Sequence, residues 1–257
     1  MVTIGVFDGV HKGHQQLISH AVRQAAQRDL PSVVLTFDPH PAEVVRPGSH
    51  PPQLTSLRQR ARLVEQLGVD VFFVLPFTPE LARMPPDQFA HEILVERLHA
   101  SVVVVGENFT FGHRALGTIS VLENLGERFG FEVQTDKLVT GPPEKTAGAL
   151  APVTFSSTYV RSCVAAGDVA AAASALGRHH RLEGIVVRGA GRGGSELGFP
   201  TANLSTSEYA AIPADGVYAC WFTHRRRGSA RWKRSCSTPT RTSTASTSSW
   251  TSSAGCA

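Results

Sequence analysis

The stretch that decides the fold is residues 2–18, VTIGVFDGVHKGHQQLI, at the front of the chain. Its apolar residues up to Phe7 predict a buried strand, and the residues from His14 onward have the apolar spacing of a helix. A glycine-rich turn between a strand and a helix offers backbone N–H groups and the positive end of the helix dipole to a phosphate. His11 and His14 are three residues apart, so they face the same side of the first helical turn. They can therefore donate hydrogen bonds to phosphate oxygens.

The spacing of the two histidines excludes two common alternatives. A zinc-binding helix requires histidines at i and i+4 with a glutamate between them, and the GxxxxGK[ST] phosphate loop has a different glycine pattern. HxGH is, however, a four-residue pattern that also arises by chance. From this stretch alone, a plain connecting turn remains an alternative.

Strand and helix patterns alternate through the first half of the chain. Strands are predicted at 2–7, 31–37, 69–77, 101–106 and 131–136, and helices at 14–27, 57–68, 86–100 and 119–129. Val-rich strands between amphipathic helices predict a parallel sheet covered on both faces. Ligands of such sheets bind beyond the carboxyl ends of the strands, where residues 11–14, 38–41 and 106–112 are expected.

The pattern changes twice in the second half. We interpret residues 140–152, rich in Pro, Gly, Lys and Thr, as a linker, and residues 156–177 as a capped helix pair. Short strands and glycine-rich turns then predict a small barrel, so we place the domains at 1–176 and 177–223. Residues 224–257 contain no Val, Ile, Leu, Met or Phe, which predicts a disordered tail rich in Ser, Thr and Arg.

Charge and composition exclude several classes of partner. The chain has a formal net charge of +4, but the seven Lys and Arg of residues 224–257 leave 18 basic against 21 acidic residues elsewhere. The body is therefore not basic, and we expect no nucleic-acid partner. Four cysteines without CxxC spacing favour neither disulfides nor zinc. No run of 18 apolar residues and no leader is present, so we expect no membrane span and a cytoplasmic protein.

Five motifs carry a resemblance to a known family. They are GVFDGVHKGH (5–14), FDPHP (37–41), GENFTFG (106–112), SSTYVR (156–161) and GAGRGGSELGFPTANL (189–204). The first four resemble the nucleotidyltransferase module of prokaryotic bifunctional riboflavin kinase/FAD synthetases. The fifth resembles the start of their riboflavin kinase module. The motifs occur in the family's order, and the resemblance covers residues 1 to about 223.

The resemblance implies an α/β fold with two activities. A Rossmann-like, parallel-sheet nucleotidyltransferase domain of the HxGH type would transfer AMP from ATP to FMN, giving FAD and pyrophosphate. A small β-barrel domain, incomplete here, would phosphorylate riboflavin with ATP to give FMN. Both steps would use Mg²⁺, and the partners would be these small molecules. The oligomeric state stays open.

The same resemblance assigns residues to roles. The implied catalytic residues are His11, His14, Asn108 and Arg161. ATP would be bound by Gly5, Phe7, Asp8, Gly9, His11, His14, Ser156, Ser157, Thr158 and Arg161. The flavin would contact Pro39, His40, Pro41, Asn108 and Phe111. In the kinase module, Gly191, Gly193, Thr201 and Asn203 would meet ATP and magnesium, with Thr201 and Asn203 nearest the metal.

Each assignment has a structural alternative. Residues 38–41 can be a strand-ending turn, because proline fixes such geometry. Asn108 can hydrogen-bond its own backbone, and Arg161 can be a surface residue of a helix. The histidines outside the motifs are interpreted as surface or packing residues. At the level of the whole chain, the alternatives are an HxGH nucleotidyltransferase for another small substrate and a non-catalytic flavin or nucleotide-binding protein.

The tail has a further interpretation. The family's kinase module continues with a segment resembling VEAFVLD…DLYG, whose glutamate is the general base, and this chain shows none of it. Read one base out of frame, the Trp232–Lys233 junction must encode Glu, and permitted codons for RWKRSCS give VEAFVL. We therefore expect a frameshift after about Thr223 and an inactive kinase module. We also expect the translation start to lie upstream of Met1, since the family has a short extension there.

Overall fold

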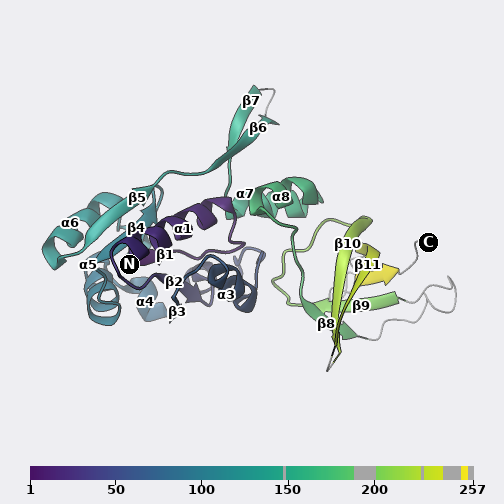
Figure 1. Ribbon diagram of the computed structural model, residues 1–257, viewed down its shortest axis with the longest axis horizontal. Helices are drawn as coiled ribbons and strands as arrows, with labels where there is room; N and C mark the ends of the chain where they lie inside the picture. Colours follow the sequence, from purple (N-terminus) through teal and green to yellow (C-terminus); the bar gives the residue numbers. More distant parts are fainter. Residues whose placement is uncertain (147–148, 188–200, 227–228, 240–249, 254–257) are drawn as a thin grey trace.

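The computed structural model describes residues 1–146, 149–187, 201–226, 229–239 and 250–253 (Figure 1). The strands of its first sheet are β1 (Val2–Ile4), β2 (Val33–Asp38), β3 (Val71–Pro76), β4 (Val102–Gly106) and β5 (Glu132–Asp136). The helices around that sheet are α1 (Lys12–Gln27), α2 (Pro41–Val45), α3 (Leu57–Glu65), α4 (Pro79–Arg83), α5 (Pro86–Phe89), the π-helix η1 (Ala90–Arg97), the 3₁₀-helix η2 (His113–Ala115) and α6 (Ile119–Phe129).

The first sheet confirms the predicted α/β class. Its strand order is β3-β2-β1-β4-β5, and every neighbouring pair is parallel. Alternate valines of β4 point to opposite faces, as the strand period requires. Val104 packs in one core with Ile18 of α1, whereas Val103 packs in another core with Leu122 of α6. Helices therefore cover both faces of the sheet, and the carboxyl ends of the strands meet at one edge.

The predicted elements differ from the observed ones mainly at their ends. β1 stops at Ile4 instead of residue 7, because the backbone turns at Phe7, whose φ of 51° is outside the strand region. The single helix predicted at 86–100 is a short α-helix followed by a π-helix. α6 has the predicted bounds, since Thr118 caps its first turn and left-handed Gly130 ends it.

The interpretation of residues 140–152 as a linker is wrong. These residues form most of an antiparallel hairpin of β6 (Thr140–Thr146) and β7 (Ala149–Thr154), which projects from the domain in Figure 1. Proline suggested a linker because it cannot donate to a sheet ladder. In a two-stranded sheet each strand has an unpaired edge, and Pro143 and Pro152 are tolerated there.

The predicted helix pair is present and joins the two parts of the chain. It consists of α7 (Ser157–Ala165) and α8 (Val169–Leu176), and Gly177 ends α8 in the left-handed conformation at φ 70°. Side chains of both helices share a core with Leu54 and Ala211, which precede and follow the pair in sequence. The limits 1–176 and 177–223 remain a proposal for the domains.

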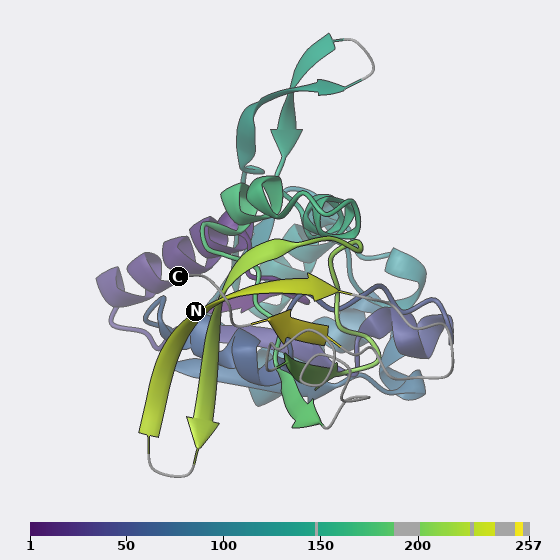
Figure 2. The same ribbon diagram turned by 90° about the vertical axis from the view of Figure 1, so that its right-hand side faces the viewer.

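A second, antiparallel sheet follows the helix pair (Figure 2). Its strands are β8 (Gly184–Val187), β9 (Thr201–Thr206), β10 (Tyr218–Arg226), β11 (Ser229–Pro239) and β12 (Trp250–Ser253), in the order β10-β11-β12-β9-β8. The prediction of a disordered tail from residue 224 therefore differs from the structure, in which β11 and β12 lie in that segment. Pairing of backbone groups with β10 and β9 does not require the apolar side chains on which the prediction depended.

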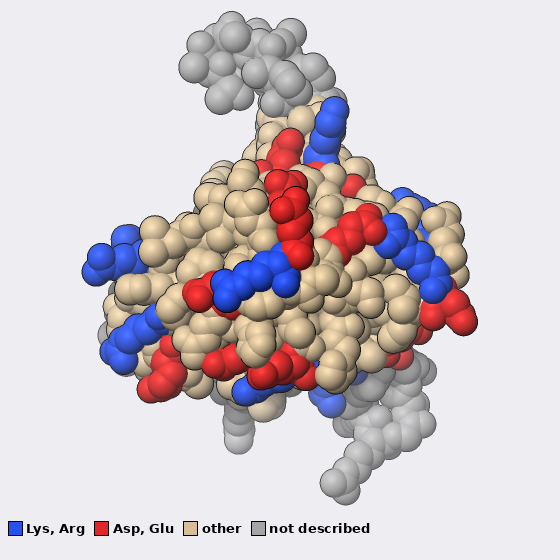
Figure 3. All heavy atoms as spheres, turned by 90° about the vertical axis from the view of Figure 1, so that its left-hand side faces the viewer, with Lys and Arg blue, Asp and Glu red and all other residues tan. Residues whose placement is uncertain are grey.

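Two properties of the surface bear on partners. Among the described residues, no helix is both long enough and apolar enough to cross a membrane. On the face shown in Figure 3, Lys and Arg side chains are interspersed with Asp and Glu.

Candidate active site

The turn after β1 is held by one buried carboxylate. Its backbone takes positive φ at Phe7 (51°), Gly9 (81°) and Val10 (40°). Asp8 is 1% exposed and accepts hydrogen bonds from the backbone N–H groups of Leu54 and Thr55, each at 3.0 Å. The Thr55 hydroxyl bonds Asp8 and accepts from the Gly9 N–H at 2.9 Å. These bonds fix the turn against the segment that precedes α3.

The same carboxylate holds Arg161 of α7. The Arg161 Nη2 lies 2.7 Å from Asp8 Oδ2, and its Nε donates to the Pro52 carbonyl at 2.8 Å. Burial raises the pKa of Asp8, but hydrogen bonds from Leu54 and the charge of Arg161 outweigh it and keep that pKa below its usual value. Asp8 and Arg161 therefore form a charged clamp behind the turn, and neither lines the cavity described below.

Two polar residues that no motif indicated complete the clamp. Arg178 donates to the carbonyl groups of Gly9 and Val10, and Gln15 donates to those of Val10 and Leu176, both at 2.8 Å. These contacts join residues up to 169 positions apart. A pattern of neighbouring residues carries no signal of such pairs.

His11 and His14 lie stacked at the start of α1. Their ring centroids are 3.7 Å apart at 27°, and the His14 ring meets the Phe7 ring edge-on at 5.1 Å. Burial lowers the pKa of His11 to about 4, and burial together with the neighbouring His11 lowers that of His14 well below 6.5. Both rings are neutral at pH 7. Neither Nδ1 atom has a hydrogen-bond partner among the described residues.

Glycine between the histidines is a steric requirement. A Cβ atom on Gly13 would lie 3.1 Å from Cε1 and 3.2 Å from Nδ1 of the His11 ring. Any side chain there would displace the ring. Gly13 was absent from the predicted site, although it belongs to the HxGH pattern itself.

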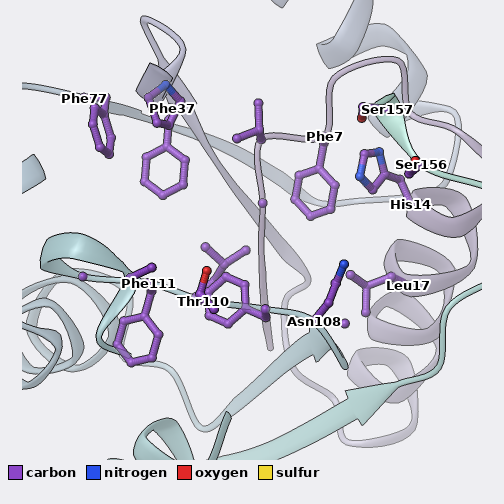
Figure 4. A pocket seen from close by; sticks show the side chains of 18 of the residues that line it. Phe7, His14, Leu17, Phe37, Phe77, Asn108, Thr110, Phe111, Ser156 and Ser157 are labelled. Atoms are coloured by element: carbon purple, nitrogen blue, oxygen red, sulfur yellow. The ribbon is translucent and has the colours of Figure 1, made fainter. Parts of the chain in front are cut away.

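A cavity of about 1180 Å³ opens in front of this turn (Figure 4). It lies at the carboxyl ends of β1, β2 and β4, where the parallel sheet predicted a ligand site. Nine of the predicted residues line it: Gly5, Phe7, His11, His14, Pro41, Asn108, Phe111, Ser156 and Ser157. Six do not: Asp8, Gly9, Pro39, His40, Thr158 and Arg161. The roles of all fifteen remain predictions.

The two ends of the cavity differ in chemistry. At one end Phe37 and Phe77 meet edge-on at 5.5 Å, and the Phe109 and Phe111 rings are stacked at 5.6 Å. In Figure 4, His14 with Ser156 and Ser157 lies on the opposite side from Phe37, Phe77 and Phe111. The first end suits a flat aromatic ligand, and the second lies at the N-terminus of α1, which suits a phosphate.

The polar end is organised by the start of α7. Ser156 caps this helix, because its hydroxyl accepts a hydrogen bond from the Tyr159 N–H at 3.1 Å. The Ser157 hydroxyl donates to the Asp8 carbonyl at 2.8 Å. The SSTYVR motif thus sets the α7 start directly against the turn that carries the histidines.

His40 has a structural role in this arrangement. Its Nδ1 accepts a hydrogen bond from the Ala42 N–H at 3.1 Å and so caps α2. Its ring contacts that of His50, which in turn packs against Tyr209 with centroids 4.5 Å apart. In the FDPHP motif, Phe37 and Pro41 therefore line the cavity, whereas His40 caps the helix that begins at Pro41.

The predicted kinase residues are only partly described. Gly191 and Gly193 lie outside the described residues, as does the side chain of Thr201. Asn203 is on β9 with 8% of its surface exposed. Among the described residues, no three His, Cys, Asp or Glu side chains are grouped to hold a metal ion.

Fold and site together define an α/β protein with a large cavity at the carboxyl ends of its parallel strands and a neutral histidine pair at the start of α1. Comparison with known sequences identifies the family to which this protein belongs. Residues 1–146 match the family model of FAD synthetase, and residues 176–250 match that of riboflavin kinase. The second match ends inside the segment that we expect to be out of frame. The chain belongs to the family of bifunctional riboflavin kinase/FMN adenylyltransferases.

Individual relatives support the family. The Haemophilus influenzae bifunctional riboflavin kinase/FMN adenylyltransferase is 34% identical over 218 residues, which are 85% of this chain and 67% of the relative. The Listeria monocytogenes protein of the same name is 35% identical over 86% of this chain and 67% of its own length. The chain thus spans about two thirds of these relatives. A crystal structure described as a macrolide-efflux protein from Streptococcus pneumoniae superposes with a TM-score of 0.80 and 29% identity, over 98% of this chain and 78% of that one.

Proposed function

We propose that the first domain transfers AMP from ATP to FMN, giving FAD and pyrophosphate. The observation that carries this proposal is the single cavity that joins a phenylalanine-lined end to a polar end at the α1 N-terminus. An isoalloxazine ring fits the first end, and the ATP phosphates fit the second. At about 1180 Å³ the cavity is large enough for both substrates.

The reaction requires positioning more than covalent catalysis. An oxygen of the FMN phosphate attacks the α-phosphorus of ATP, and a new P–O bond forms there. The bond from that phosphorus to the bridging oxygen breaks, and its electron pair leaves with pyrophosphate. No side chain needs to form a covalent bond, so the protein's contribution is to align the substrates and stabilise the charge that develops.

The histidines supply that stabilisation as neutral donors. Because the rings are uncharged at pH 7, each has one N–H to give to a phosphate oxygen. The first turn of α1 adds backbone N–H groups that have no partner inside the helix. Preorganised donors in a water-poor site stabilise a developing charge more than the same donors in water.

Asn108 and Arg161 differ in how their proposed roles fit the structure. Asn108 lines the cavity and lies between its two ends in Figure 4, so its amide can reach the phosphate of FMN. Arg161 is bound to Asp8 and to the Pro52 carbonyl. A phosphate-clamping role for Arg161 would use the guanidinium N–H groups that these two bonds leave over, and it requires the side chain to reach a cavity that it does not line.

Magnesium is expected with ATP, and its chemical contribution is to neutralise phosphate charge. The described residues offer no cluster of ligands for it. We therefore assign the ion no protein ligand and expect it to arrive on the ATP phosphates. The magnesium role of Thr201 and Asn203 in the kinase module remains a prediction. That module would transfer a phosphoryl group from ATP to riboflavin to give FMN. We propose that it is inactive in this chain, because the sequence does not show the segment that carries the general base.

Isotope labelling tests the proposed transfer directly. The purified chain is incubated with FMN, Mg²⁺ and ATP labelled either on the α-phosphate or on the γ-phosphate. The proposal predicts the α-label in FAD and the γ-label in pyrophosphate. Quenching of FMN fluorescence without any labelled FAD would identify a flavin-binding protein instead. Transfer of the α-label to an acceptor other than FMN would identify another nucleotidyltransferase.

A further inference from the structure

Asp136 is a cavity-lining carboxylate that lies in none of the five motifs. It is the last residue of β5, and its backbone pairs with Gly106 at the end of the neighbouring strand β4. It therefore lies at the same sheet edge as Gly5 and Asn108, which line the cavity with it. The motif-based site had no residue from β5.

The two oxygens of Asp136 have different surroundings. Oδ1 lies 2.6 Å from Nδ1 of His20, a residue of α1, and this contact fixes the orientation of the carboxylate. Oδ2 is buried and has no hydrogen-bond partner among the described residues. A buried carboxylate oxygen without a donor costs free energy, so a donor from a ligand would be favourable there. Two charged residues are neighbours of Asp136: Lys137 follows it in sequence and also lines the cavity, and Glu107 donates its backbone N–H to the Asp136 carbonyl and accepts a hydrogen bond from the Leu138 N–H with its side chain.

Asp136 lies at a distance from His14 that suits the nucleoside part of ATP. His20, its partner, is six residues after His14 on the same helix, or about 9 Å along the axis. A nucleoside whose α-phosphate lies at His14 extends over such a distance. The phenylalanine-lined end is formed by other elements, namely β2, the loop after β3 and the loop after β4. In the strand order β3-β2-β1-β4-β5, Asp136 is on the edge strand opposite to β2 and β3, which carry Phe37 and precede Phe77, so it lies away from that pair of the proposed flavin site.

We propose that Asp136 binds the nucleoside of ATP, with Oδ2 accepting a hydrogen bond from a ribose hydroxyl or from the amino group of adenine. His20 is the positioning residue that holds the carboxylate in place. Acidic side chains at strand ends bind ribose hydroxyls in other α/β nucleotide sites, which shows that the chemistry is suitable. The inference rests on the proposed adenylyl transfer.

Steady-state kinetics with Asp136→Ala provide the test. Loss of a hydrogen bond to a charged acceptor raises KM for ATP between about 10- and 100-fold. We expect kcat at saturating ATP and KM for FMN to stay within about twofold, because the carboxylate touches neither the flavin nor the phosphates. The Glu107→Gln variant is the matched control, since Glu107 is a nearby carboxylate outside the cavity lining.

Nucleotide analogues identify the donor. The variant and the wild-type protein are compared with 2′-deoxy-ATP, 3′-deoxy-ATP and purine riboside triphosphate, which lacks the amino group. With the analogue that lacks the donor, the two proteins should differ by less than about threefold in KM. An equal loss with ATP and all three analogues would overturn the inference, and so would an unchanged KM for ATP.

His20 and the proposed function are tested separately. His20→Ala should raise KM for ATP less than Asp136→Ala does, and it should have no further effect in the Asp136→Ala background. If the wild-type chain makes no FAD, the proposed function fails. The inference is then tested by calorimetric titration with ATP: an affinity of Asp136→Ala equal to that of the wild-type protein would overturn it.

Discussion

At the scale of single residues, the imidazole of His14 is the side chain whose replacement tests the proposed reaction. Its side chain is half-buried, its ring is stacked on His11, and it lies at the polar end of the cavity. Replacing His14 with Ala should lower kcat/KM for FAD formation by about 100-fold or more, because one preorganised donor to the transferring phosphate is lost. The measurement is FAD formed from FMN and ATP, separated by chromatography. A loss below threefold, with the variant folded, would remove His14 from the mechanism.

The buried His11 makes stability depend on pH. Burial lowers its folded-state pKa to about 4, below the 6.5 of the unfolded chain. Between these two values the unfolded chain binds a proton that the folded protein does not, so stability falls as the pH falls through this window. The contribution of His11 is present above pH 6.5, and about 2 kcal/mol of it is lost at pH 5.

A comparison with His11→Gln isolates this contribution, since burial also lowers the pKa of His40 and His180. Urea unfolding at pH 7.5 and pH 5.0 gives the free energy of unfolding of both proteins. The wild-type protein should lose more stability between the two pH values than the variant does. Equal losses would show that His11 titrates normally in the folded protein.

At the scale of elements, Asp8 connects the turn after β1, the segment before α3 and the helix α7. Asp8→Ala leaves Arg161 without its carboxylate and leaves two buried N–H groups without an acceptor. We expect the free energy of unfolding to fall by about 3–5 kcal/mol. Urea denaturation measures it, with Asp29→Asn, at an exposed position after α1, as the control. A change below 1 kcal/mol would mean that the clamp does not hold these elements together.

The elements also show what a sequence can reveal. Strands β2 to β5 and α6 were predicted because each is a continuous apolar or amphipathic segment whose signal is local. The cavity was located because parallel strands place their carboxyl ends at one edge. Local patterns are also the reason that most motif residues line the cavity.

Contacts between distant residues were not predictable in this way. Three polar side chains contact partners that are far away in sequence. Arg178 and Gln15 donate to backbone carbonyls, and Nη1 of the buried Arg60 donates to the Thr36 hydroxyl. The hairpin of β6 and β7 was missed because its prolines suggested a linker, although they are tolerated in a two-stranded sheet. The place of Asp136 depends on the packing of β5 against α1, which no single segment encodes.

At the scale of the whole molecule, backbone hydrogen bonds connect the segment before α3 to the segment after β9. The Gln53 N–H donates to the Tyr209 carbonyl at 2.5 Å, and the Gln53 carbonyl accepts from the Ala211 N–H at 2.8 Å. Within the second part, His180 donates from Nε2 to the Ala211 carbonyl at 2.8 Å and so holds the residue that bonds Gln53. The segment before α3, which carries the hydrogen-bond donors to Asp8, thus also contacts the second domain. A change that unfolds the second domain removes these hydrogen bonds, and we therefore expect it to lower the stability of the first domain at this segment.

The frameshift proposal is tested on the coding DNA. After about codon 223, we expect the frame whose codons join the third base of one codon to the first two bases of the next to encode a segment resembling VEAFVL with its glutamate. Direct sequencing of the gene decides this. Codons for RWKRSCS that cannot yield such a segment in that frame would refute the frameshift, and with it the reason given for proposing an inactive kinase module.

The most direct test of the central claim is one chromatographic assay of the purified 257-residue chain. The protein is incubated with ATP and Mg²⁺, in parallel with FMN and with riboflavin, and His14→Ala serves as the control for contaminating enzymes. The account predicts FAD from FMN, no product from riboflavin, and FAD formation at least about 100-fold slower with the variant. Absence of FAD from FMN would contradict the claim that the cavity is an adenylyl-transfer site. FMN formed from riboflavin would contradict the loss of the kinase.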